Sequence, residues 1–216
     1  MGVLSAIPCF GVVRRKGISM PTRNEMRLTF YMPNEGEFVS DFVVRHHRRN
    51  PWKTQSVAAL LFSSGANYVA LCFPEKVALR EPEDRIRVPV QGRLEGLRVD
   101  PVEGARLIMA DKAQVWIKSE AIHYLGFGYT RSFRTQDVEL PYNKCLHFVY
   151  CEMEAWQRLP SRTTYARRLE WYPLASLKAM AKASMDERKA WFFLEALKQV
   201  AAKHTQFAPK LRRAVG

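Results

Sequence analysis

The sequence predicts an α+β fold, because blocks of strand-like runs are followed by helix-like segments along the chain. Two helix starts are clear: Asp100 is followed by proline and then by Glu103, and Ser184 is followed three residues later by Glu187. Short apolar runs bounded by turn residues precede each helix and indicate strands. The 216 residues, 47% hydrophobic and 25% charged, suffice for one well-buried domain with extensions.

Before residue 54 two runs, 26–32 and 38–47, are expected to be extended and to be joined by a turn at 33–37. The densest basic cluster follows at 45–53 and contains Trp52. This cluster is either a solvated turn between strands or a patch that contacts phosphates, with the indole ring stacking on a base.

The central part of the chain predicts a β-hairpin, a short strand and then a helix. The hairpin consists of the apolar runs 56–64 and 67–73, and the strand consists of residues 86–90. The helix is expected over 100–117, with an aspartate cap and a capping box that Glu103 completes. Its buried face is expected to contain Ala105, Ile108, Met109, Val115 and Trp116.

In the last third, strands are expected over 121–133, 143–155 and 167–174, and a short helix over 174–181. The final helix starts at the capping box Ser184–Glu187 and has one apolar stripe: Ala190, Phe193, Leu194, Leu197, Val200 and Ala201. The segment that follows is expected to be a basic, loose tail.

The charge balance indicates a polyanionic partner. Lys and Arg number 34 against 21 Asp and Glu, a formal net charge of +13 at pH 7. Such a field attracts nucleic acid above all. An anionic membrane surface is the alternative, although no basic amphipathic helix stands out and no run approaches the ~18 apolar residues of a transmembrane helix.

The cysteines and histidines do not form a metal-binding or catalytic pattern. Four single cysteines, Cys9, Cys72, Cys145 and Cys151, lie in apolar surroundings and are expected to be free thiols in a reducing compartment. His123 and His147 lie in predicted strands, where packed or edge histidines are the favoured interpretation. We therefore expect no metal ion and no cofactor.

The N-terminal 24 residues carry Arg14, Arg15, Lys16 and Arg23 and no acid. A segment with scattered arginine and serine and no acidic residue is typical of organelle import, here into the mitochondrion. A basic arm that binds an anionic partner is the alternative, and the two interpretations are compatible.

From about Val57 to His204 the chain resembles the Nudix superfamily. The signature loop and helix of this family read G-x5-E-x7-R-E-U-x-E-E-x-G-U, where U is apolar. With Gly92 as the first glycine, the signature arginine falls on Arg106 and the last glutamate position on Asp111. The strand and short helix around LEWYPL also follow the family order. The resemblance implies a mixed β-sheet sandwiched between helices, with a basic extension at 1–53, the Nudix-like domain at 54–205 and a basic tail at 206–216.

The remaining signature positions lack the acids of the family. The loop glutamate is replaced by Arg98, and the next two glutamates by Leu107 and Ala110. Nudix hydrolysis needs clustered carboxylates that hold Mg²⁺ against a pyrophosphate. The resemblance therefore implies a degenerate box and a protein that is not an enzyme. A hydrolase with acids supplied from elsewhere, such as Glu139, Glu152 or Glu154, is the less favoured alternative.

Basic residues outside the box are the expected contacts to RNA phosphates, with Trp52 as a stacking residue. They are Arg45, Arg48, Arg49, Lys53, Arg131, Arg134, Arg167, Arg168, Lys210, Arg212 and Arg213.

Among non-catalytic members of the superfamily, the chain looks most like the Nudix-like protein of the mitochondrial large ribosomal subunit. This resemblance implies a ribosomal component in the mitochondrial matrix that contacts rRNA and neighbouring proteins. An RNA-binding subunit of a mitochondrial mRNA processing or stability complex is the alternative.

Overall fold

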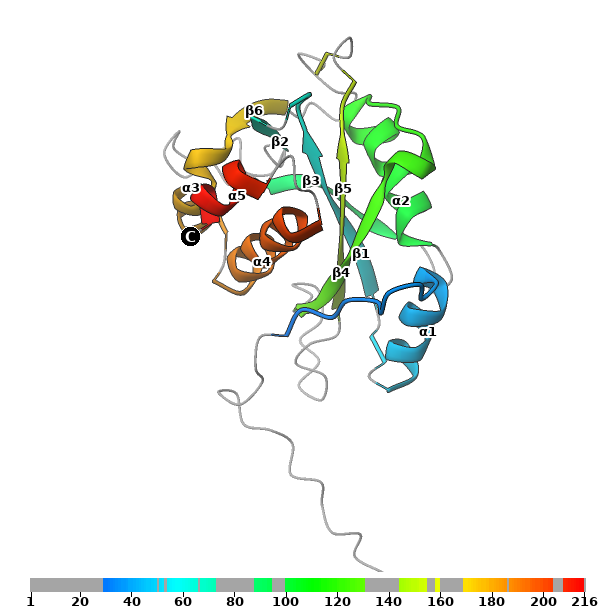
Figure 1. Cartoon of the computed structure of the whole chain (residues 1–216). Coiled ribbons are helices and arrows are strands. Elements are labelled where there is room, and N and C mark those ends of the chain that lie inside the picture. Colours follow the sequence, from blue (N-terminus) through cyan, green and yellow to red (C-terminus); the bar gives the residue numbers. More distant parts are fainter. Residues whose placement is uncertain are drawn as a thin grey trace, which may run out of the picture.

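A computed structural model of the chain describes residues 29–49, 51–52, 54–65, 67–72, 88–94, 100–130, 144–154, 158–159, 169–185, 187–203 and 208–215. Its centre is one mixed β-sheet with helices on both faces (Figure 1). None of the described helices is long and apolar enough to cross a bilayer.

Over the described residues the sheet has six strands in the order β4-β5-β1-β3-β2-β6. They are β1 (Thr54–Phe62), β2 (Tyr68–Cys72), β3 (Val88–Leu94), β4 (His123–Thr130), β5 (Lys144–Glu152) and β6 (Leu169–Pro173). β1 and β5 run parallel over nine residue pairs, and the other pairings are antiparallel. The hairpin predicted for β1 and β2 is confirmed, but the two strands pair only at Phe62 and Val69, because β3 lies between them.

The alternating side chains of the strands separate two apolar cores, one on each face of the sheet. On one face, Val57, Ala59 and Leu61 of β1 pack with α1 (Val39–Arg49) and α2 (Pro101–Ile108). On the other face, Ala58 and Leu60 pack with three C-terminal helices. These helices are α3 (Leu177–Ser184), α4 (Glu187–Lys203) and α5 (Ala208–Val215). The predicted fold class, an α+β arrangement with a mixed sheet sandwiched between helices as the Nudix resemblance implied, is confirmed.

The prediction of an extended run over 38–47 is wrong, because this segment forms α1. Val39, Phe42, Val43 and His46 recur at helical spacing, and Phe42 and Val43 are buried against the first core. The residues of its last turn are basic, which suits the partial negative charge at that end of a helix.

The helix predicted over 100–117 starts as expected but ends early. Asp100 caps α2 by accepting a hydrogen bond from the Val102 amide at 2.8 Å. A π-helical turn, Met109–Ala113, follows, and Gln114 then adopts a left-handed conformation with φ of 53°. Residues 114–118 continue without helix. Val115 is buried as predicted, whereas the prediction for Trp116 is wrong, because 69% of its surface is exposed.

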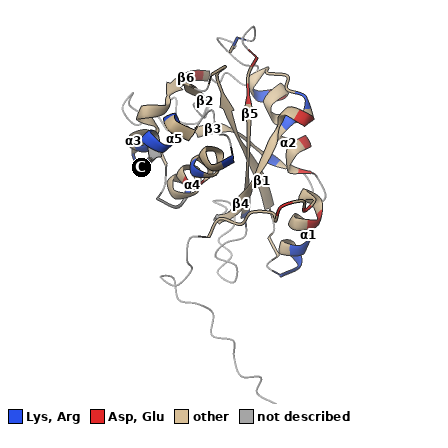
Figure 2. Cartoon of the chain, viewed as in Figure 1, with Lys and Arg blue, Asp and Glu red and all other residues tan. Residues whose placement is uncertain are grey.

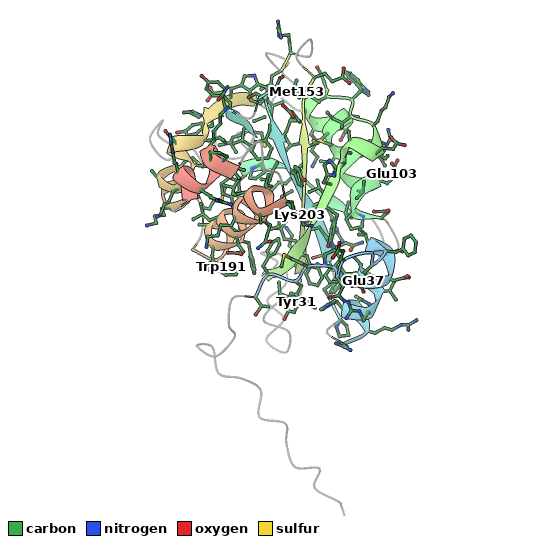
Figure 3. The ribbon with its side chains drawn as sticks, viewed as in Figure 1. Tyr31, Glu37, Glu103, Met153, Trp191 and Lys203 are labelled. Carbon is green, nitrogen blue, oxygen red and sulfur yellow. The ribbon has the colours of Figure 1, made fainter. Side chains whose placement is uncertain are left out.

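Two glycines of β4 allow other parts of the chain to approach the strand closely. A Cβ on Gly128 would clash with the Phe192 ring of α4, and a Cβ on Gly126 would clash with the Tyr31 carbonyl oxygen. Tyr31 forms a β-bridge with Phe127, in which each amide donates to the other residue's carbonyl at 2.9 Å. Residues 29–32 therefore lie along β4, at the point where Figure 3 labels Tyr31.

The predicted stripe of the last long helix is confirmed. Ala190, Phe193, Leu197, Val200 and Ala201 of α4 are buried, and Leu194 is partly buried against the same core. The prediction of a loose tail is wrong, because residues 208–215 form α5. Leu211 of α5 is fully buried, so this helix is anchored in the second core.

Candidate functional site

The described residues of the predicted degenerate Nudix box lie at the corner between β3 and α2. Gly92 is paired with Val57 inside β3, and a Cβ there would lie 2.8 Å from Ile108 and 2.9 Å from Lys112 Nζ. The glycine thus allows α2 to pack tightly on the strand. Lys112 Nζ donates to the backbone carbonyl of Gln91 at 3.2 Å, which holds a positive charge at this corner.

The box positions on α2 and on the π-helical turn that follows it include one carboxylate. Leu107 lies in α2, whereas Ala110 and Asp111 lie in the turn Met109–Ala113, three and four residues further along the chain. Leu107 is 51% exposed, Ala110 is half-buried and Asp111 is exposed. A leucine and an alanine contribute no metal ligand, so Asp111 is the one ligating side chain among the three.

Arg106, at the signature arginine position, forms an ion pair within the helix. Its Nε and an Nη donate to the Glu103 carboxylate at 2.8 and 2.5 Å, and Ser119 Oγ donates to the same carboxylate at 3.3 Å. The hydrogen bonds from Arg106 and Ser119 lower the pKa of Glu103, and the same pair raises the pKa of Arg106. Glu103 is thus occupied as the partner of Arg106.

The structure describes two of the three acids that could have rebuilt a metal site, Glu152 and Glu154. Glu152 ends β5 and accepts a hydrogen bond from the Gly65 amide at 2.6 Å, at the turn between β1 and β2. Glu154 is exposed beyond β5, and Glu139 lies outside the described residues. In the part of the chain that the structure describes, no three His, Cys, Asp or Glu residues are grouped so that they could hold a metal ion.

The predicted RNA contacts fall on two described helices. Arg48 and Arg49 are exposed in the last turn of α1, whereas Arg45 donates to both oxygens of Glu37, at 2.6 and 2.8 Å. Lys210, Arg212 and Arg213 are exposed on α5, and Lys210 Nζ donates to the Gly65 carbonyl at 2.7 Å. Figure 2 shows these basic residues on α1 and α5, which lie on opposite faces of the sheet. Arg98, Lys53, Arg131, Arg134, Arg167 and Arg168 lie outside the described residues.

The interpretation of Trp52 as a base-stacking residue is wrong for this structure. The side chain is 3% exposed and packs among Phe127, Tyr129 and His147, with ring centroids 5.6 to 6.3 Å apart. Its ring belongs to the first core, and a nucleobase could not reach it without opening that core.

A buried polar cluster lies inside the first core. His147 is fully buried, its Nδ1 is 2.9 Å from the Tyr124 hydroxyl, and its Nε2 is 3.2 Å from Gln55 Oε1 and 3.3 Å from Cys145 Sγ. Burial lowers the pKa of His147 to about 3 and raises that of Tyr124 well above its usual value.

Three of the four cysteines, Cys72, Cys145 and Cys151, are buried free thiols, as predicted, and Cys9 lies outside the described residues. The His147 ring and the three thiols are enclosed in the interior of the protein, which suits a packing role.

A cavity that the sequence did not reveal opens beside the end of β5. It has a volume of about 460 Å³ and is lined by the segment after α2 and by Glu152, Met153, Glu154 and Arg158. Its one sequence signal is the alternation of residues 114–118: Val115 and Ile117 are buried, whereas Trp116 and Lys118 are exposed. Such alternation is typical of an extended segment, whereas the capping box at Asp100 predicts a helix that continues through these residues.

No protein-family model matches the chain, and no curated protein matches it in sequence. Among solved structures the chain is similar to Tm1382, a candidate Nudix hydrolase, with a TM-score of 0.48 and 10% identity. That match covers 77% of this chain and 87% of Tm1382. A MutT structure, from work on the Aliivibrio salmonicida and Vibrio cholerae proteins, has a TM-score of 0.40 and 8% identity. It covers 58% of this chain and 84% of the MutT chain.

Proposed function

We propose that the chain is a non-catalytic Nudix-like protein and a structural component of the mitochondrial ribosome, with the large subunit favoured, where it contacts rRNA and neighbouring proteins. The observation that supports the loss of catalysis is the set of side chains at the corner between β3 and α2. Among the described box positions Asp111 is the one carboxylate, and the Lys112 ammonium donates to the Gln91 carbonyl.

Magnesium chemistry supports this proposal. Mg²⁺ binds through hard oxygen ligands in a near-octahedral arrangement, and its sites in phosphate-cleaving enzymes use carboxylates together with substrate phosphates. Leu107 and Ala110 supply no such oxygen, and the carbonyl oxygen of Gln91 already accepts from a lysine. The Lys112 ammonium would repel a divalent cation at this corner, and among the described box positions Asp111 is the one carboxylate that would attract it.

The placement of the basic residues supports RNA as the partner. Arg48 and Arg49 are exposed on α1, and Arg212 and Arg213 are exposed on α5, on the other side of the sheet. Cations on two opposite sides neutralise phosphates of two separate RNA segments more readily than those of one strand in one groove. A protein that lies between two RNA segments of an assembly needs basic residues on both of these sides. The acid-free residues 1–24 support a mitochondrial location.

The experiment is sedimentation of the tagged full-length protein from lysed mitochondria, with the RNA and proteins of each fraction identified. We expect the protein to migrate with the large ribosomal subunit at moderate salt. A matched variant, Arg212→Glu with Arg213→Glu, reverses two exposed charges and should shift a larger share of the protein to the top of the gradient. Lys178→Glu with Lys182→Glu on α3 is the control that changes the net charge equally.

Two other results would overturn the ribosomal assignment. A small complex that RNase dissolves would instead favour an RNA-binding subunit of a mitochondrial mRNA processing or stability complex. A free monomer that releases inorganic phosphate or pyrophosphate from nucleoside diphosphate derivatives in the presence of Mg²⁺ would contradict the loss of catalysis as well.

A further inference from the structure

The outer side of α1 presents an acid, an apolar residue and a base in that order along the helix. Asp41, Val44 and Arg48 follow one another at intervals of three and four residues, so they share one side of α1. All three are exposed, whereas Phe42 and Val43 are buried in the first core. Figure 2 shows the same separation of charge, with acid at the start of α1 and base at its end.

The two charges on this side are not neutralised by the described part of the chain. Arg45 follows Asp41 by four residues, the usual spacing of a helical ion pair, but it donates to both oxygens of Glu37. Neither Asp41 nor Arg48 forms an ion pair with a described residue. Each residue advances a helix by ~1.5 Å, so α1 presents an acid and a base about 10 Å apart.

Apolar surface accompanies these charges. Phe38, at the start of α1, is 76% exposed and is the most exposed large apolar residue that the structure describes. Val44 lies between the two charges with 42% of its surface exposed. Pro51, just beyond the other end of the helix, is exposed as well. Aromatic residues are enriched at the contacts between proteins, so this side of α1 has the composition of such a contact.

The order acid, apolar residue, base is complementary to itself when two such helices run antiparallel. A twofold axis beside the middle of α1 places Asp41 opposite Arg48 of a second copy and Arg48 opposite Asp41 of that copy. The two Val44 side chains then meet near the axis, and Phe38 extends toward Pro51 of the second copy. A parallel pair would instead place equal charges opposite each other, so the charge pattern favours the antiparallel arrangement.

We propose that two copies of the chain associate through an antiparallel pair of α1 helices, held by two Asp41–Arg48 ion pairs around the two Val44 side chains. One helix of 11 residues from each copy gives a small interface, so the dimer is weak and reversible. The formal net charge of +13 opposes association at low salt, but at physiological salt the repulsion is screened beyond about 8 Å. The dimer concerns the free protein and does not depend on the proposed RNA partner.

Analytical ultracentrifugation of the full-length protein at about 0.15 M salt tests this association. The weight-average mass should rise from that of one chain toward that of two between about 1 μM and 1 mM protein, the range of weak contacts. Asp41→Arg would place an arginine opposite each Arg48, and Arg48→Asp would place an aspartate opposite each Asp41. Either variant alone should therefore raise the dissociation constant roughly tenfold or more.

Exchange of the charges separates the ion pairs from other effects. An equimolar mixture of the Asp41→Arg and Arg48→Asp proteins should form a heterodimer, because each arginine then faces an aspartate. The double variant Asp41→Arg with Arg48→Asp should associate with itself again. Glu120→Arg and Arg213→Asp, at exposed positions away from α1, change the net charge by the same amounts and should leave the association unchanged.

Three results would overturn the dimer through α1. They are a wild type that stays monomeric up to about 1 mM, a dimer that neither single variant weakens, and a loss that neither the mixture nor the double variant restores. Circular dichroism shows whether each variant keeps its helices. If a charge variant does not fold, Val44→Lys decides, because it brings two ammonium groups together near the axis. Association of that variant as tight as that of the wild type would equally overturn the proposal.

Discussion

Acidification should destabilise the protein through His147, and replacement of this residue should remove that sensitivity. The imidazole is fully buried on β5. In the neutral ring, Nε2–H donates to Gln55 Oε1 at 3.2 Å and the Tyr124 hydroxyl donates to Nδ1 at 2.9 Å. A second proton on Nδ1 would face the Tyr124 hydroxyl in an apolar core. Burial therefore lowers the pKa of His147 from 6.5 to about 3.

The sign and size of the effect follow from proton linkage. Between pH 3 and 6.5 the unfolded chain binds a proton at His147 that the folded chain does not bind. The free energy of unfolding is therefore highest above pH 6.5 and falls as the pH drops below this value. From pH 7 to pH 5 the loss attributable to this one residue is about 2 kcal/mol.

Urea unfolding at pH 7, 6 and 5 measures this loss. The wild type and His147→Gln are compared, and His123→Gln, at an exposed position of neighbouring β4, is the matched control. The stability of His147→Gln should fall about 2 kcal/mol less over this range than that of the other two proteins. Equal pH dependence in all three would refute the reasoning. If His147→Gln does not fold, histidine NMR of the wild type decides, because titration of the His147 ring near pH 6 would contradict the buried neutral state.

Three further predictions concern single positions. Gly128→Ala should lower the free energy of unfolding by about 1–3 kcal/mol, measured in urea, because the added methyl group meets the buried Phe192 ring; a neutral effect would contradict this packing. Asp100→Ala should lower the free energy of unfolding, measured in urea, by about 1 kcal/mol, because the hydrogen bond from the Val102 amide is lost. Asp100→Asn should restore most of this stability. Burial raises the pKa of the Cys151 thiol to about 12, so a thiol reagent at pH 8 should label this residue, identified by mass spectrometry, only after unfolding.

The elements that the sequence predicted well are those whose local signals agree with their burial. The Asp100-Pro101 start of α2 and the apolar stripe of α4 are examples, because capping and periodicity are encoded within a few residues. Residues 38–47 misled the prediction because valine and phenylalanine favour strands, while the spacing of Phe42, Val43 and His46 on a helical face decided the structure.

The candidate site was harder to predict, because its geometry depends on contacts that are distant in sequence. The helix stops at Gln114 in a left-handed conformation without a glycine to mark the end, so Trp116 could not be recognised as exposed. Trp52 is buried by rings from β4 and β5, which no local pattern around residues 45–53 reveals. The box positions, in contrast, depend only on residue type at fixed spacing, and their assignment stays a prediction.

The pairing of Tyr31 with Phe127 limits how far the N-terminus can be shortened without exposing β4. Among the described strands β4 is the outermost on its side of the sheet, and an uncovered edge strand offers free amides and carbonyls to a second molecule. Residues 29–32 occupy part of that edge, and the absence of a Cβ on Gly126 allows the Tyr31 carbonyl to approach the strand closely. Removal of the residues before 29 would leave this cover in place. Removal of Tyr31 as well would expose the edge, and the shortened protein would be expected to self-associate through β4.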